Sequence, residues 1–174
     1  IVSSSYDFLQ LEDAGLCFEG KVYEPVPKAA LSQTLSKNPQ HCEAALQTLI
    51  QQADGDYQFM MVKNGWLAAG RDPIGVLPLY YGETRDIAAF ATNRKALWRL
   101  GIEHPISFPP GNMGFVNKEG FKFQPVKTLA YTQPKTVTID DAAKMLQVLL
   151  EESLKRRTRG LEKVAVAFSG GIDS

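Results

Sequence analysis

The chain has 174 residues, of which 44% are apolar and 22% are charged, as in an ordinary soluble globular protein that can bury its own core. Its formal net charge is zero, which argues against a partner that is nucleic acid or an acidic membrane surface. No apolar run approaches the ~20 residues that a membrane-spanning helix needs. We therefore expect small-molecule partners, with no nucleic acid and no membrane.

The cysteines give a weak indication of the compartment. Cys17 and Cys42 are the only two in the sequence, and two thiols so far apart do not make a disulfide framework. A reducing cytoplasm is therefore the location that we expect. The first residue is Ile1 rather than Met, so we also expect that the native N-terminus is missing.

The first third of the chain predicts one strand and one helix. Residues 16–23 are rich in β-forming side chains, and Gly20 within them indicates a bend or a close approach of another backbone. Asn38 and Pro39 supply a helix cap and a first-turn proline. Apolar residues then recur at helical spacing, which predicts an amphipathic helix over 39–53 that ends at residues 54–56.

From residue 57 the pattern changes to short antiparallel strands. Residues 57–63 and 66–71 flank Asn64-Gly65, the strongest short hairpin signal. Asn93 or Thr92 can cap a short helix over 94–100, which Gly101 would close. We expect further strands at 76–81, 87–92, 113–116 and 121–123.

A change in composition near residue 132 predicts a domain boundary. Thr138 and Asp141 form a capping box, and the apolar residues that follow mark one face of a long helix over 139–159. Basic residues in its last turns interact favourably with the negative end of the helix dipole, and we expect them to be solvated. Helix, strand and glycine loop in this order are typical of the start of an α/β domain.

The last eleven residues combine an apolar run with a glycine-rich loop. Residues 164–168 are continuously apolar, which predicts a strand buried on both faces. The loop that follows, Ser-Gly-Gly-Ile-Asp-Ser, offers amide and hydroxyl donors that suit phosphate, although an ordinary turn is the plainer alternative. The full string resembles the SGGxDS pyrophosphate loop of the ATP-pyrophosphatase (PP-loop) family.

Four segments of the earlier chain resemble type-2, N-terminal-nucleophile (Ntn) glutamine amidotransferases. Residues 16–23, LCFEGKVY, resemble the family's vfNGEIYN segment, and residues 71–81, RDPIGVLPLYY, resemble its RDpfGikPLYY hairpin. Residues 90–97, FATNRKAL, resemble FASExKAL, and Pro110-Gly111 resembles a PG turn. Within that family, the asparagine-synthetase branch places a helix and SGGxDS after the glutaminase domain.

The resemblance implies an α+β fold in two parts. Residues 1–132 would form an Ntn-hydrolase-like αββα sandwich of antiparallel sheets, with its N-terminus missing. Residues 133–174 would supply the first helix and strand of an α/β PP-loop domain, truncated after SGGIDS. The implied parent is an asparagine synthetase-like ligase that adenylates a carboxylate such as aspartate with ATP and transfers nitrogen from glutamine or ammonia. A homodimer is the assembly that we expect for it.

The glutaminase site that the resemblance implies is degraded. The family attacks glutamine with an N-terminal cysteine, and neither Ile1 nor the following serines offer that nucleophile. Glu19 occupies the position of the asparagine that donates to the oxyanion, while Gly20 keeps the backbone half of that site. Lys21 replaces a glutamate, and His41 aligns with the aspartate that binds the substrate amine. An alternative is a non-catalytic pseudo-glutaminase domain that serves folding, docking or dimerisation.

Neither cysteine is a convincing replacement nucleophile. Cys42 follows His41 directly, and neighbours in a helix do not face each other. Cys17 lies in a predicted strand, where a small apolar core residue is the commoner role. We therefore expect no catalytic residue in this part of the chain.

The resemblance also implies an ATP site at the end of the sequence. Its pyrophosphate-binding residues would be Ser169, Gly170, Gly171, Asp173 and Ser174. Asp173 would in addition help to hold Mg²⁺, which prefers oxygen ligands, and the backbone of Phe168 would lie near the adenosine. We expect ATP and Mg²⁺ to act in the parent protein, and this stretch alone to bind ATP weakly or not at all.

Overall fold

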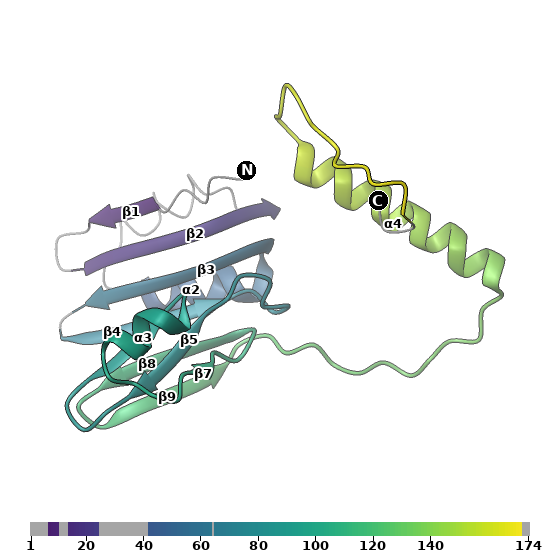
Figure 1. The fold of residues 1–174 in the computed structure, drawn as a ribbon. Coiled ribbons are helices and arrows are strands. Elements are labelled where there is room, and N and C mark those ends of the chain that lie inside the picture. Colours follow the sequence, from purple (N-terminus) through teal and green to yellow (C-terminus); the bar gives the residue numbers. More distant parts are fainter. Residues whose placement is uncertain (1–6, 11–13, 25–41, 64, 172–174) are drawn as a thin grey trace. The chain divides into compact units, whose positions relative to one another are not determined.

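A six-stranded antiparallel sheet forms the centre of the first part of the chain (Figure 1). The computed structural model describes residues 7–10, 14–24, 42–63 and 65–171. The strands of the large sheet, in spatial order, are β1 (Asp7–Gln10), β2 (Ala14–Glu24), β3 (Asp54–Lys63), β4 (Trp66–Arg71), β8 (Asn112–Asn117) and β9 (Gly120–Pro125). A second sheet has the order β6 (Ala88–Ala91), β5 (Tyr80–Glu83) and β7 (Ile106–Ser107).

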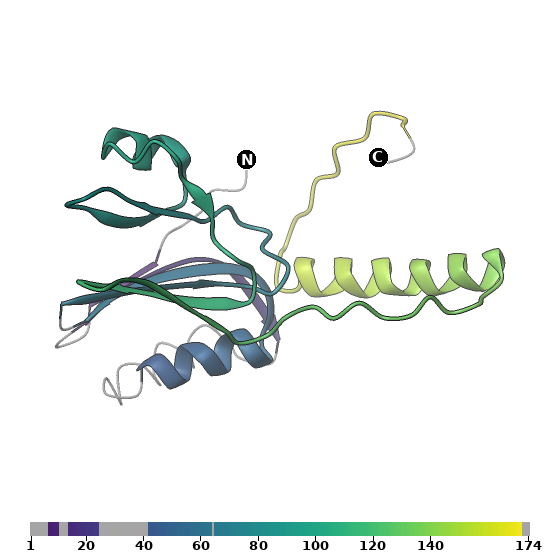
Figure 2. The same cartoon turned by 90° about the horizontal axis from the view of Figure 1, so that it is seen from below.

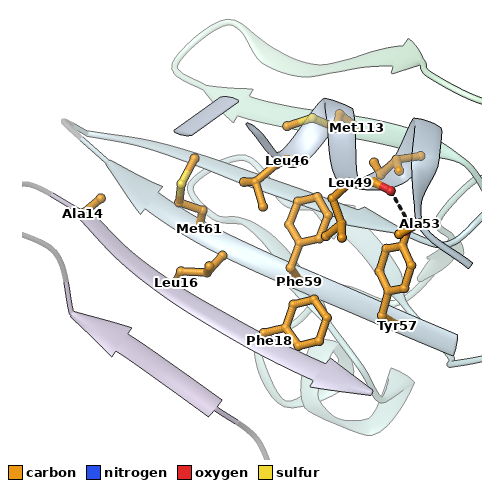
Figure 3. Close-up of a cluster of buried hydrophobic side chains, with 11 residues drawn as sticks. Ala14, Leu16, Phe18, Leu46, Leu49, Ala53, Tyr57, Phe59, Met61 and Met113 are labelled. Carbon is orange, nitrogen blue, oxygen red and sulfur yellow. Dashed lines mark hydrogen bonds between the residues drawn. The ribbon is translucent and has the colours of Figure 1, made fainter. Parts of the chain in front are cut away.

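Helix α2 (Cys42–Gln52) covers one face of the large sheet. Side chains alternate between the two faces of a strand, so every second residue of β3 points towards the helix. Phe59 and Met61 of β3 point towards this helix, and both are almost fully buried (Figure 3). The hydroxyl of Tyr57 donates to the carbonyl of Leu49 at 3.1 Å, which ties the strand to the helix. The buried members of this core are Ala14, Leu16, Phe18, Leu46, Leu49, Ile50, Ala53, Tyr57, Phe59, Met61 and Met113.

The opposite face of the large sheet packs on the small sheet through aromatic side chains. Tyr81 of β5 lies 4.7 Å from Phe123 and 5.0 Å from Phe121, measured between ring centroids. Phe90 and Phe108 complete the cluster at 5.7 Å. The short helix α3 (Arg94–Arg99) covers the small sheet, so the layers follow in the order α, β, β, α (Figure 2). The expected α+β sandwich of antiparallel sheets is confirmed.

Several local predictions from sequence are also confirmed. Lys63 pairs with Trp66 across the predicted tight turn between β3 and β4. The side chain of Asn93 accepts a hydrogen bond from the amide of Lys95 at 2.8 Å, as an N-cap does. Gly101 then ends the helix with φ +80°, a conformation that favours glycine.

One predicted boundary of α2 lies outside the described residues, and the strand after α2 starts earlier than predicted. Helix α2 is described from Cys42 onward, and residues 39–41 lie outside the described part of the chain. The helix ends at Gln52, in agreement with the prediction, but residues 54–56 already belong to the next strand. They begin β3, because Asp56 pairs with Lys21 and Gly55 pairs with Val22.

The strand expected over 76–81 is wrong in its first half. The carboxylate of Asp72 accepts hydrogen bonds from the amides of Ile74 and Gly75 at 2.9 and 2.7 Å. The guanidinium of Arg71 donates to the carbonyl of Leu77 at 3.1 Å. Asp72 also accepts from the amide of Val76 at 3.3 Å, so the side chains of Asp72 and Arg71 take up backbone groups of residues 76 and 77 that a strand would pair. Regular pairing starts only at Tyr80 and continues to Glu83.

The chain divides into two compact units, Ile1–Ala130 and Tyr131–Ser174. The second unit contains α4 (Ile139–Thr158), which confirms the predicted long helix; its cap is the hydroxyl of Thr138, which accepts from the amide of Asp141 at 3.1 Å. No residue of α4 is buried, so its apolar face is uncovered within this unit. None of the described helices is long and apolar enough to cross a membrane.

The strand expected over 164–168 is wrong. In the described chain these residues pair with no other segment, and Val166 and Phe168 are 79% and 76% exposed. A strand needs a neighbouring strand to take up its amide and carbonyl groups, and an apolar run alone does not supply one. The β-rich composition of this run therefore does not by itself produce a strand.

Replacing Leu46 by alanine tests the core between α2 and the large sheet. Leu46 is fully buried, so Leu46→Ala should lower the free energy of unfolding by about 2–5 kcal/mol. The matched change Leu100→Ala, at a side chain that is 45% exposed, should cost less than about 0.5 kcal/mol. Urea unfolding followed by the fluorescence of Trp66 and Trp98 measures both, and equal losses would contradict this packing.

Candidate functional site

The pairing of β2 with β3 brings Glu19 directly opposite Gln58. Directly opposite residues share a face of the sheet, so the two side chains meet. The amide nitrogen Nε2 of Gln58 donates to Oε2 of Glu19 at 2.6 Å. Their strand neighbours Phe18 and Phe59 point to the other face, into the α2 core (Figure 3). Glu19 and Gln58 therefore lie on the sheet face that points away from α2.

A small pocket opens beside this pair, and we call it the Glu19 pocket. It encloses about 170 Å³ of empty space, which includes open solvent. Thr92 follows strand β6 of the small sheet, so the pocket receives residues from both sheets. Its lining residues are Cys17, Glu19, Gln58, Phe59, Met60 and Thr92.

Gln58 is the buried polar residue of the Glu19 pocket. Its side chain is only 2% exposed, and its carbonyl oxygen Oε1 has no hydrogen-bond partner in the described chain. A buried acceptor without a donor costs on the order of 1–3 kcal/mol, so such groups call for an explanation. The amide group of Gln58 thus satisfies Glu19 with one end and leaves an acceptor open at the other.

The thiol of Cys17 lies two residues from Glu19 on the same strand face. Burial raises the pKa of Cys17, and the negative charge of Glu19 raises the pKa further. A thiol with a raised pKa forms less of the nucleophilic thiolate at neutral pH. The environment of Cys17 therefore supports a role other than nucleophile, while the side chain of Cys42 lies outside the described residues.

Gly20 is placed where no other residue fits. Its φ is +112°, and a Cβ atom added there would lie 2.0 Å from the carbonyl oxygen of Asp56. This confirms the close backbone approach predicted from the sequence. The next residue, Lys21, holds its ammonium group 5.6 Å from the centre of the Tyr23 ring. His41, the other substrate-binding candidate, lies outside the described residues.

The expected phosphate loop is described only in its first half. Gly170 has φ +81°, and the amide of Gly171 donates to the hydroxyl oxygen of Ser169 at 3.4 Å. Amide and hydroxyl donors fit a phosphate, which agrees with the implied ligand. Asp173 and Ser174 lie outside the described residues, so the roles of Ser169–Ser174 and Phe168 in ATP and Mg²⁺ binding stay predictions.

Gln58 is the site residue that sequence reasoning missed. It stands between Tyr57 and Phe59, and a polar residue between two core aromatics in a strand faces away from their core. That alternation was visible in the sequence. Its contact with Glu19 was not, because the contact depends on the register between strands 39 residues apart.

Substitution of Gly20 tests the close approach of β2 and β3. Gly101→Ala is the matched control, because Gly101 also has a positive φ but nothing lies within 4 Å of its added Cβ. Gly101→Ala should cost about 1–2 kcal/mol of unfolding free energy from backbone strain alone. Gly20→Ala should cost clearly more, because its Cβ also collides with the Asp56 carbonyl; equal costs in urea unfolding would contradict the geometry.

The reactivity of Cys17 tests the charge of Glu19. In a Cys42→Ser background, the alkylation rate by iodoacetamide should rise with pH, with a midpoint above that of a free cysteine. Glu19→Gln removes the negative charge, so the midpoint should move to lower pH and alkylation at a fixed pH should be faster. Glu103→Gln, at an exposed acid elsewhere, serves as the control. An unchanged midpoint in Glu19→Gln would refute the electrostatic coupling.

Known proteins resemble this chain in sequence. A family model described as "Glutamine amidotransferase domain" matches residues 12–99, about half of the chain. A putative asparagine synthetase [glutamine-hydrolyzing] of Methanocaldococcus jannaschii is 30% identical over 143 residues, which cover 72% of this chain and 26% of the relative. A probable asparagine synthetase of Schizosaccharomyces pombe is 32% identical over 117 residues, covering 62% and 20%. The chain thus spans about a quarter or less of these two curated relatives.

Solved structures agree with the fold. A glutamine phosphoribosylpyrophosphate amidotransferase from B. subtilis, complexed with ADP and GMP, aligns with TM-score 0.52 and 18% identity over 72% of this chain and 32% of that one. An allosteric regulatory enzyme of purine biosynthesis aligns with TM-score 0.51 and 19% identity over 72% and 31%. Identities this low speak for the fold alone. The matched domain and the curated relatives together establish that the chain belongs to the glutamine amidotransferase domain family, in its asparagine synthetase-like group.

Proposed function

We propose that this chain is part of an asparagine synthetase-like, ATP-dependent ligase whose glutaminase site is degraded. The parent would adenylate a carboxylate and transfer nitrogen to it, and the nitrogen would arrive as free ammonia. The family match and the curated relatives support the first part of the proposal. The hydrogen bond from Gln58 to Glu19 is the observation that carries the second part.

Glutamine hydrolysis needs hydrogen-bond donors where its tetrahedral intermediate develops negative charge. Glu19 stands where the family resemblance puts a donating asparagine. As an ionised carboxylate it has acceptor oxygens only, and it repels an oxyanion. Removing one such donor costs about 10²–10³ in rate in well-studied hydrolases, before any repulsion is counted.

Gln58 is a poor substitute for the missing donor. Its Nε2 group is directed at Glu19 at 2.6 Å, and its exposed fraction is 2%. Donating to an oxyanion instead would leave the carboxylate of Glu19 without this partner. The pair therefore stabilises itself rather than a developing negative charge.

A non-catalytic role for the first unit is the second candidate. Its two cores are well packed, with side chains such as Leu46, Phe59 and Phe108 almost fully buried. A site without its donor on an intact scaffold is the pattern that a domain retained for folding, docking or dimerisation would show. In that case the domain would contribute structure, and catalysis would depend on the rest of the parent.

Ammonia release from glutamine tests the proposal. The protein should release no ammonia above the uncatalysed rate. In a full-length protein that begins with the family's cysteine nucleophile, Glu19→Asn should raise the rate, because it restores a donor. Glu19→Ala is the control, because it removes the repelling charge without adding a donor. Glutamine turnover by the unaltered protein would overturn the proposal, and no gain in Glu19→Asn would show that the damage extends beyond Glu19.

The nitrogen source can be tested separately in the complete protein. With ATP, Mg²⁺ and aspartate, the complete protein should form the amide product and release pyrophosphate when ammonium chloride is supplied, and should not do so with glutamine. Equal product from glutamine would contradict a degraded glutaminase site. No product from either nitrogen source would favour the non-catalytic role.

A further inference from the structure

Helix α4 exposes more apolar side chains than any other element of the described chain, and none of its residues is buried. Ile139 at its start is 88% exposed. The other large apolar side chains of the helix are between 54% and 61% exposed: Met145, Leu146, Val148, Leu149, Leu150 and Leu154. An exposed apolar surface of this extent marks a place where a partner binds.

The apolar positions of α4 form one stripe with the seven-residue repeat of paired helices. Spacings of three and four residues alternate along the stripe, as they do where two helices pack side by side. Its core positions are Ile139, Ala142, Leu146, Leu149 and Ser153. Glu151 and Lys155 lie on the opposite side of the helix, where their charged groups are 3.9 Å apart. The stripe therefore has the geometry of a seam for another helix.

The stripe is complementary to itself when a second copy runs in the opposite direction. Its two leucines, Leu146 and Leu149, lie at the centre, and the small residues Ala142 and Ser153 lie on either side of them. Antiparallel pairing would place Ala142 opposite Ser153 of the second copy, and Leu146 opposite its Leu149. Small residues would then face small ones and leucines would face leucines, so the two helices could approach evenly along their length.

The charges at the two ends of α4 favour the same direction. Asp140 and Asp141 lie in the first turn, whereas Lys155, Arg156 and Arg157 lie in the last turn. An antiparallel pair brings the acidic end of each helix beside the basic end of the other, and it also brings the opposite ends of their dipoles together. A parallel pair would place like charges side by side at both ends.

We propose that α4 is a dimerisation helix, which pairs in antiparallel orientation with α4 of a second copy of this chain. A sheet is the competing partner, because helices in α/β domains pack on sheets. Packing on a sheet would not require the two ends of α4 to match each other in residue size and in charge. The inference goes beyond the proposed function, since it involves no residue of the Glu19 pocket and needs neither glutamine nor ATP.

Sedimentation equilibrium of the 174-residue chain tests the pairing. Helix α4 has 20 residues and is about 30 Å long, so one pair of helices makes a small interface, and we expect a micromolar dissociation constant. Leu149→Asp places a charge in the centre of the seam and should weaken dimerisation at least tenfold, by about 1.4 kcal/mol or more. Val148→Asp is the matched control, because Val148 is 54% exposed outside the seam, and it should leave the dissociation constant unchanged.

Cysteine cross-linking tests the direction of the pairing. In a Cys17→Ser and Cys42→Ser background, chains with Ala142→Cys are mixed with chains carrying Ser153→Cys and treated with a short bismaleimide. The mixture should give a cross-linked dimer. Each variant alone should give little, because an antiparallel pair holds the two copies of either position about 16 Å apart along the helix axis. Both variants keep the leucines of the seam, so this result does not depend on whether Leu149→Asp folds.

Several results would overturn the proposal. A chain that stays monomeric well above micromolar concentrations would have no such contact, and equal weakening by Leu149→Asp and Val148→Asp would place the contact elsewhere. Efficient cross-linking of the Ala142→Cys variant alone would contradict the antiparallel direction. The same mixture is then made with the complete protein, and its cross-linked peptides are identified by mass spectrometry. Absence of the peptide that joins positions 142 and 153 would mean that other segments of the parent cover α4.

Discussion

The antiparallel pairing of β2 with β3 is the constraint on which the rest of the first unit depends. Its register places Phe18 opposite Phe59 on one face and Glu19 opposite Gln58 on the other. A shift by one residue would exchange these faces, and would bury the Glu19 charge in the α2 core. Gly20 and Gly55 permit this register, because a Cβ atom at either position would collide with the backbone of the facing strand.

Local sequence signals predicted much of the fold. The hairpin of β3 with β4 and the Asn93 cap of α3 depend on neighbouring residues, and both were confirmed. Errors arose where distant partners decide the outcome. Asp72 and Arg71 take up the backbone groups of residues 74–77, and the apolar run 164–168 has no strand beside it in the described chain. The Glu19–Gln58 contact depends on register, so it could not be predicted.

The hydrogen bond between Gln58 and Glu19 is also the contact on which the proposed function depends. A carboxylate that accepts from a buried amide is an acceptor site, and glutamine hydrolysis needs a donor site. The raised pKa of Cys17 follows from the same charge together with burial. Family membership places the chain among asparagine synthetase-like amidotransferase domains, and the proposal that its glutaminase site is degraded rests on the carboxylate of Glu19.

A double-mutant cycle between Glu19 and Gln58 tests this central contact most directly. The free energies of unfolding of Glu19→Ala, Gln58→Ala and the double variant are compared with that of the unaltered chain. The account predicts a favourable coupling of about 1 kcal/mol or more, as expected for a hydrogen bond to a charged group. Additivity to within about 0.3 kcal/mol would contradict it, because the two side chains would then not interact.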